Sequence, residues 1–150
     1  MRIPEDADVR NDYFQCRGII LKGDKVLVMF RSKKDKGEYY VFPGGHMRHY
    51  EEPIETVERE IEEETTIKVK NLKPAYDFIN HTEPEMRDYY FVGKWVSGEP
   101  KLSGEESRES NEDNYYEPMW VDIDDIQELN LYPRAAKEWV HDFLIRFIED

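Results

Sequence analysis

The stretch that decides the fold is GGHMRHYEEPIETVEREIEEETTI, residues 44–67. Two glycines open it directly after the run Tyr39–Phe42 and Pro43, which predicts a short strand that ends in a glycine loop. The residues from Pro53 to Thr65 are strong helix formers, and proline suits the first helical position. We therefore expect a loop followed by a helix that begins at Pro53.

Helical periodicity predicts two different faces on this segment. Glu60, Glu63 and Glu64 stand at positions i, i+3 and i+4, so their three carboxylates should converge on one side. A neighbouring face is aliphatic and should pack against a sheet; it consists of Ile54, Val57 and Ile61. The helix can therefore be buried along one side while it presents acid to a cleft along the next.

The density of negative charge on this segment needs an explanation. Eight glutamates lie between positions 51 and 64, and like charges four residues apart destabilise a helix by about 0.2–0.5 kcal/mol per pair. An ordinary solvated acidic face is one interpretation. The other is a divalent cation, which would remove the repulsion, because hard cations such as Mg²⁺ take oxygen ligands from carboxylates, water and phosphates.

The spacing of the whole stretch resembles the Nudix box, which reads Gly, any five, Glu, any seven, Arg-Glu, aliphatic, any one, Glu-Glu, any one, Gly, aliphatic. Eight positions are in register: Gly45, Glu51, Arg59, Glu60, Ile61, Glu63, Glu64 and Ile67. The final glycine is replaced by Thr66. Even in a glutamate-rich chain, a chance match of this quality has a probability below roughly one in a thousand.

The resemblance implies a reaction and a set of roles. Nudix hydrolases cleave a nucleoside diphosphate linked to another moiety, by attack of water on phosphorus with bound Mg²⁺ or Mn²⁺. By this resemblance Glu63 and Glu64 are metal ligands, the carbonyl of Gly44 is a further ligand, and Arg59 orients the catalytic glutamates. Glu60 is the general base or another ligand, two roles that the sequence does not distinguish.

The family commonly adds one more carboxylate from the loop before a late strand. The candidates here are Glu105, Glu106, Glu109, Glu112 and Glu117, and we favour Glu112 because it precedes the strand of Trp120 by a turn-sized loop. Thr66 is the one departure from the box. Glycine at that point normally adopts a left-handed conformation that threonine resists, so we expect a changed helix exit.

Three arginines are candidate contacts for the phosphates of a substrate: Arg31, Arg17 and Arg87. For any one of them, an ordinary surface arginine is the competing interpretation. The aromatic residues Tyr39, Phe42 and Tyr89 are candidates for stacking on a base, although strand aromatics more often pack in a core.

The rest of the chain predicts an α/β fold, of the Nudix α/β/α sandwich type with a central mixed sheet, formed by a single domain over residues 1–150. Segments Phe14–Lys22 and Val26–Arg31 flank a Gly23-Asp24 turn and should form a hairpin. Further strands are expected at Ile67–Ile79 and Met86–Val96, continuing as a meander, and at Tyr115–Val121.

The end of the chain predicts a loop and an amphipathic helix. Residues 98–114 are polar and acidic, which is typical of a surface loop. After Asp122–Glu128 a helix is expected from about Pro133. Its apolar stripe is Ala136, Trp139, Val140, Phe143, Leu144, Phe147 and Ile148, which should cover the sheet; a cofactor or partner groove is the alternative.

Composition restricts the setting and the partners. The chain has 150 residues, a formal net charge of −13 and one cysteine, Cys16. Such a charge repels a polyphosphate backbone, so no stable complex with nucleic acid is expected. One cysteine forms no intrachain disulfide, and the charged first ten residues do not resemble a signal peptide, which favours the cytoplasm. No apolar run approaches the roughly 20 residues that cross a bilayer.

Three other functions compete with the hydrolase. Isopentenyl diphosphate isomerases share a related fold, but their resemblance includes a mid-chain catalytic cysteine, whereas Cys16 lies near the amino end. A non-catalytic module that binds a nucleotide or a protein is less consistent with three retained glutamates. A Ca²⁺ buffer lacks EF-hand spacing here. The expected partner is a small phosphorylated molecule. Dimers are common in the family, but the sequence leaves open whether this chain forms a homodimer.

Overall fold

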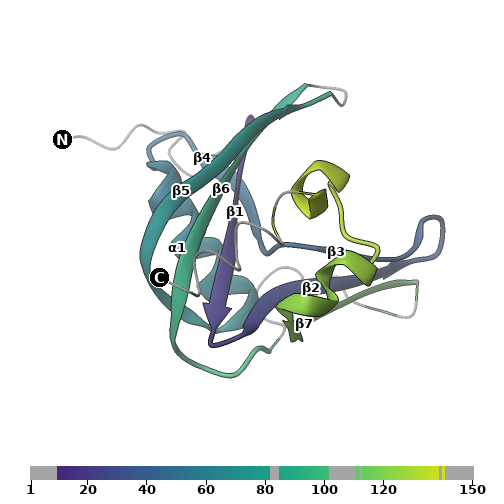
Figure 1. Ribbon diagram of the computed structural model, residues 1–150. Coiled ribbons are helices and arrows are strands. Elements are labelled where there is room, and N and C mark those ends of the chain that lie inside the picture. The colour runs from purple at the N-terminus through teal and green to yellow at the C-terminus, as the bar shows by residue number, and fades with distance from the viewer. Residues whose placement is uncertain (1–9, 82–84, 102–110, 112, 139, 141–150) are drawn as a thin grey trace.

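The computed structural model describes residues 10–81, 85–101, 111, 113–138 and 140. The elements with defined bounds are the strands β1 (Arg10–Lys22), β2 (Lys25–Lys33), β3 (Gly37–Val41), β4 (Gly44–Arg48), β5 (Lys68–Asn80), β6 (Met86–Ser97) and β7 (Asn114–Asp122), the helix α1 (Pro53–Thr65) and the 3₁₀ helix η1 (Ile123–Glu128). Figure 1 shows β1 beside β6, with β2, β3 and β7 extending away from them.

The strands form one mixed sheet, as predicted. Its main path is β3-β2-β1-β6-β5, with β4 paired to β1 and β7 paired to β2. The expected meander is confirmed for β5 and β6, which pair antiparallel. It is wrong for the sheet as a whole, because β1 and β6 run parallel, from Phe14 opposite Arg87 to Leu21 opposite Lys94. The hairpin of β1 and β2 does form, but its ladder has only the pairs Leu21–Val26 and Lys22–Lys25. The rest of this edge of β1 is therefore available to β4, while β6 occupies the opposite edge.

Strand β4 was not expected, because two glycines after Pro43 predicted a loop. It pairs antiparallel with β1, with Arg17 opposite Gly44 and Cys16 opposite Gly45. A side chain at Gly44 would collide with the carbonyl oxygen of Cys16 and the backbone of Arg17. Glycine therefore allows two strands to approach here, and its role is close packing rather than chain reversal.

Side-chain alternation along β1 separates two cores. Cys16 and Ile20 face α1, where they pack with Leu27, Val57, Ile61, Ile67 and Phe91. Ile19 and Leu21 face the opposite side, where the core is Val26, Val28, Phe42, Tyr90, Val92, Ile123, Ile126, Leu131, Ala136 and Val140. Helix α1 thus covers one face, while η1 and the helical residues 134–138 and 140 cover the other. This arrangement confirms the α/β class.

Helix α1 has the predicted bounds, and its predicted inner face is confirmed at two of three positions. Val57 and Ile61 are fully buried, whereas Ile54 is 38% exposed. Thr56 is buried in its place because its hydroxyl donates to Oε1 of Glu51 at 3.1 Å. The loop before the helix therefore covers the first turn on a side that apolar periodicity did not indicate.

Gly18 sets how closely α1 approaches the sheet. A Cβ added at Gly18 would lie 2.5 Å from Cδ1 of Ile61 and 3.0 Å from Cγ1 of Val57. Gly18→Ala should therefore push α1 outward and lower the free energy of unfolding by about 1–3 kcal/mol, the usual cost of overpacking. Urea denaturation measures this change.

The double substitution Gly18→Ala with Ile61→Val is the control, because it removes the Cδ1 methyl that meets the new Cβ. Ile61→Val alone should cost about 0.5–1.5 kcal/mol, yet in the Gly18→Ala background it should cost less or restore stability. Strictly additive effects would show that the contact between these two positions does not limit the packing.

The exit of α1 differs from our expectation. Thr66 does adopt the left-handed conformation, with φ 66° and ψ 3°, so the family geometry is kept without the family glycine. The hydroxyl of Thr66 donates to the carbonyl of Glu99 at 3.1 Å. Lys101 N also donates to the carbonyl of Thr65 at 3.0 Å. These tertiary contacts hold a β-branched residue in a conformation that costs about 1–3 kcal/mol.

Thr66→Gly should therefore stabilise the protein. Glycine removes the backbone strain but loses one hydrogen bond and gains entropy in the unfolded chain, so the net gain is about 1 kcal/mol. Thermal unfolding of Thr66→Gly beside Thr66→Ala measures it. Alanine also lacks the hydroxyl but keeps a Cβ. If Thr66→Gly is no more stable than Thr66→Ala, the backbone at residue 66 is not strained by a side chain.

The expected terminal helix lies only partly within the described residues. Residues 134–138 and 140 are helical, and Ala136 and Val140 are fully buried, as the apolar stripe predicts. Trp139, Phe143, Leu144, Phe147 and Ile148 fall outside the described residues. Among the residues that are described, no helix is long and apolar enough to cross a membrane.

Candidate active site

Arg59 is the centre of the candidate site, and its guanidinium contacts three carboxylates. Its Nε and Nη2 donate to the two oxygens of Glu51, at 2.6 and 2.9 Å. Its Nη1 donates to Glu60 at 2.7 Å and to Glu63 at 3.1 Å. A planar guanidinium suits such a fork, which a lysine ammonium does not match. The orienting role expected of Arg59 is consistent with this geometry.

Glu51 is the important residue whose role the sequence analysis missed. Its side chain is only 4% exposed. Besides Arg59 it accepts hydrogen bonds from Arg48 N at 2.9 Å and from the hydroxyl of Thr56 at 3.1 Å. Burial alone would raise the pKa of Glu51, but the hydrogen bonds from Arg59 and Arg48 outweigh it, so the pKa lies below its ordinary value. The sequence did contain a signal for this role, because Glu51 is the first glutamate of the Nudix box.

Residues 42–46, which lead from β3 into β4, are called the catalytic loop, and Gly45 brings this loop against α1. A Cβ at Gly45 would lie 2.7 Å from both Cδ and Oε2 of Glu60. The carboxylate of Glu60 therefore occupies the space that a side chain at Gly45 would fill. Two box residues that are 15 positions apart in the sequence, and whose chemistry the resemblance couples, are thus in contact.

The expected convergence of three carboxylates is incomplete in this structure. Glu60 and Glu63 share Nη1 of Arg59, with side chains 17% and 50% exposed. Glu64 lies buried at 8% exposure, because it follows Val57 and Ile61 on the inward face. In the part of the chain that the structure describes, no three carboxylate, imidazole or thiol groups are gathered closely enough to hold an ion. Glu64 thus lies on the inward face of α1, while Glu60 and Glu63 are held together by Arg59.

An open hollow of about 460 Å³ borders the outer side of α1. Its lining is strongly acidic and consists of Tyr50, Glu51, Glu55, Glu58, Arg59, Glu62 and Glu63. Carboxylates repel the phosphates of a substrate unless cations intervene. We therefore assign the substrate no position in this hollow, although Arg59 and Glu63 connect it to the site.

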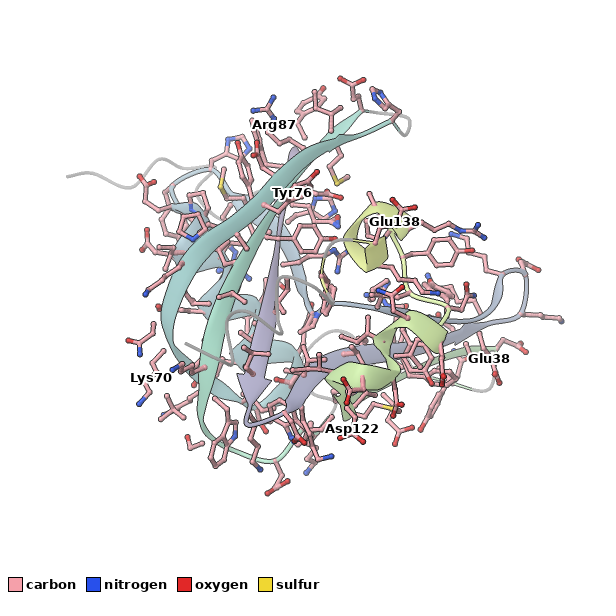
Figure 2. The ribbon with its side chains drawn as sticks, in the orientation of Figure 1. Glu38, Lys70, Tyr76, Arg87, Asp122 and Glu138 are labelled. Carbon is pink, nitrogen blue, oxygen red and sulfur yellow. The ribbon has the colours of Figure 1, made fainter. Side chains whose placement is uncertain are left out.

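The three candidate phosphate contacts do not lie together. Arg17 donates from Nη1 to the carbonyl of Phe42 at 2.6 Å. The guanidinium of Arg31 lies 5.1 Å from the ring of Tyr116. Arg87 lies near the start of β6 and pairs with Asp77 at 3.9 Å between exposed side chains; Figure 2 shows it toward the tip of the β5–β6 hairpin. Of the three, the structure connects Arg17 to the glycine loop.

Of the five glutamates that are candidates for the additional carboxylate ligand, the structure describes Glu117. Glu105, Glu106, Glu109 and the favoured Glu112 lie outside the described residues. Glu117 lies on β7 and accepts a hydrogen bond from the hydroxyl of Tyr115 at 3.0 Å. It lies on the same face of β7 as Met119 and Val121, which pack against the core on the side away from α1. Glu117 therefore does not face the carboxylates of α1.

Comparison with known proteins identifies the family of the chain. The family model of the NUDIX domain matches residues 13–143. An uncharacterized Nudix hydrolase, YvcI, of Bacillus subtilis is 31% identical over 121 residues, covering 77% of this chain and 69% of the relative. An RNA pyrophosphohydrolase of Bartonella clarridgeiae is 23% identical, covering 87% of each chain. A NUDIX hydrolase structure from Nitrosomonas europaea superposes with a TM-score of 0.70 at 17% identity, covering 90% of each chain.

The chain therefore belongs to the Nudix family. It is a MutT-like Nudix pyrophosphohydrolase, an enzyme that acts on small phosphorylated substrates. Members of this family generally use divalent metal ions.

Proposed function

We propose that this enzyme hydrolyses a diphosphate linkage in a nucleoside diphosphate joined to another moiety, such as a nucleoside triphosphate, ADP-ribose or a nucleotide sugar, and that it requires Mg²⁺ or Mn²⁺. The observation that carries the proposal is the contact of Glu60 with the backbone of Gly45. It brings a carboxylate to the loop whose carbonyl, at Gly44, is the other expected oxygen donor. Hard divalent cations prefer such all-oxygen sets.

Each residue of the site has a proposed role. Glu60, Glu63 and Glu64, with the carbonyl of Gly44, would hold the metal, and Glu112 is the proposed addition from the late loop. A bound divalent cation would neutralise charge on the phosphate oxygens and lower the pKa of bound water. Arg59 orients Glu60 and Glu63 through Nη1. Glu60 is also the candidate general base, since its carboxylate lies at the loop.

The 150 residues are proposed to form one domain. The two cores lie on opposite faces of the same sheet and share strands, since β1 contributes Ile19 and Leu21 to one and Cys16 and Ile20 to the other. Two separate domains would not share a strand between their cores, because each domain builds its core from its own elements. A single cooperative unfolding transition seen by two independent probes would support this proposal.

The test of the activity is release of phosphate, pyrophosphate or nucleotide from a panel of nucleoside diphosphate derivatives, with Mg²⁺, with Mn²⁺ and with a chelator. Metal-dependent cleavage of one substrate class is the expected result and names that class. Equal cleavage with chelator would overturn the metal requirement. Mg²⁺ should also raise the melting temperature, because it binds only the folded site; no shift at millimolar metal would count against the site.

A further inference from the structure

Residues 42–46, which lead from the end of β3 into β4, must be held accurately, since Gly44 and Gly45 lie within them. Their backbone is tied to β1 by the ladder at Arg17–Gly44 and Cys16–Gly45. Gly18 N also donates to the carbonyl of Pro43 at 2.9 Å. Two glycines in succession provide little stiffness of their own, so side-chain contacts at the two ends of the segment determine how firmly it stays in place.

Two arginines provide such contacts from opposite faces of the sheet. Nη2 of Arg59, on the α1 side, donates to the carbonyl of His46 at 3.3 Å. Nη1 of Arg17 donates to the carbonyl of Phe42 at 2.6 Å. Arg17 alternates with Cys16, which faces α1, and shares the parity of Ile19, which faces the other core. The two bonded carbonyls bracket Pro43, Gly44 and Gly45.

The guanidinium of Arg17 is itself oriented by its neighbours. When the amide of Gln15 is oriented with its oxygen toward Arg17, that oxygen accepts from Nε of Arg17 at 3.0 Å and also from Nη2. In the parallel ladder, Asp88 lies opposite Gln15 and Tyr90 lies opposite Arg17. Asp88 and Tyr90 are each only 1% exposed. Arg17 therefore belongs to a group of polar residues on β1 and β6. Its guanidinium donates hydrogen bonds to other groups of the protein, whereas an arginine that binds a substrate phosphate would direct its donors toward solvent.

We propose that Arg17 is a positioning residue for the catalytic loop, which fixes the Phe42 carbonyl from the face opposite α1 and so sets where Gly44 and Gly45 lie relative to Glu60. This inference rests on the proposed function for its kinetic consequence. Its structural part, the restraint of the loop, stands independently and can be measured without substrate or metal.

Cys16 offers a direct reporter of the loop. It is the only cysteine in the chain, it is fully buried, and it lies opposite Gly45 in the ladder. Burial is the main cause that raises the pKa of its thiol to about 12. Alkylation of Cys16 therefore requires local opening, and loosening of the β1–β4 pair should accelerate it.

The experiment compares Arg17→Met with Lys70→Met, a control that also removes one cation but from the exposed part of β5 labelled in Figure 2. Alkylation by iodoacetamide and kinetics are measured for both. We expect Arg17→Met to alkylate about ten- to a hundredfold faster, as loss of one charge-assisted hydrogen bond implies. We also expect kcat to fall about 100-fold through misplacement of the loop, with KM changed by less than about threefold and Lys70→Met unchanged.

Arg17→Lys is the second variant, since an ammonium keeps the charge and one donor for Phe42 but cannot also span Gln15. It should give intermediate values of both readouts. An increase in KM with unchanged kcat and alkylation would overturn the proposal and assign Arg17 to the substrate. If alkylation of Arg17→Met is faster only by the factor that its lower global stability predicts, the loop is not specifically loosened and the proposal is also overturned. If the wild-type enzyme cleaves no member of the panel, the proposed function fails, while the alkylation rates still decide the loop restraint.

Discussion

Replacing Arg59 by methionine should lower the free energy of unfolding by about 3–5 kcal/mol, the usual result of removing one partner of a buried ion pair. Glu51 would keep its hydrogen bonds from Arg48 and Thr56, but its charge would be left uncompensated in a site where its side chain is 4% exposed. Urea denaturation at pH 7 measures the effect. Such a loss is a large fraction of the stability of a typical domain.

Two controls separate this effect from simple loss of charge. Lys25→Met removes an ion pair of the same 2.6 Å length, to Asp122, but both side chains are about half exposed, so its effect on stability should be much smaller than that of Arg59→Met. Adding Glu51→Gln to Arg59→Met removes the orphaned charge and should recover part of the loss. If Arg59→Met costs no more than Lys25→Met, the pair is not a structural anchor.

The pH dependence of the free energy of unfolding provides a third control. Protonation of Glu51 should destabilise the native enzyme but relieve the destabilisation in Arg59→Met. In the native enzyme the pKa of Glu51 is below the ordinary value of 4.5, so the stability from this group is present above pH 4.5 and is lost as the pH falls through the folded pKa. In Arg59→Met only burial and weaker hydrogen bonds act, burial raises the pKa, and acidification protonates the orphan. The stability difference between the proteins should therefore narrow on acidification.

Local signals predicted the elements near the site well. The bounds of α1 follow from Pro53 and the run of helix formers, and β2 and β7 differ from expectation by one or two residues at each end. These features depend on residues that are close in sequence. The parallel pairing of β1 with β6 joins segments about 70 residues apart, and no local pattern encodes which edge of β1 remains free.

The parts of the site that could not be predicted depend on contacts across the chain. Helical spacing placed Glu60, Glu63 and Glu64 on one side, but it did not show that Arg59 would bond two of them while Glu64 turned inward. Likewise, the sequence predicted a turn at Gly44, whereas the structure shows that glycine is needed there because the backbone of Cys16 lies close to it. The left-handed Thr66 is similar, since its strain is offset by contacts with residues 99 and 101. In each case a tertiary contact outweighs a correct local preference.

Glu63→Gln should reduce turnover by about 100-fold or more while leaving the fold intact. The amide keeps the shape of the side chain and can still accept from Nη1 of Arg59, so stability should change by less than about 0.5 kcal/mol, as for other exposed positions. The amide lacks the charge that a divalent cation requires, and the metal contributes several kcal/mol to the transition state. The melting temperature increase with Mg²⁺ should shrink in parallel with kcat.

Glu62→Gln is the matched control, because it makes the same chemical change at the adjacent exposed position of α1, outside the register of the box. It removes one negative charge and leaves the proposed ligands in place, so kcat and the Mg²⁺ effect should remain close to those of the native enzyme. Equal losses in the two variants would mean that general negative charge on α1, and not Glu63 as a ligand, supports turnover. A full loss in Glu63→Gln with an unchanged Mg²⁺ effect would instead indicate a catalytic role for Glu63 without a bond to the metal.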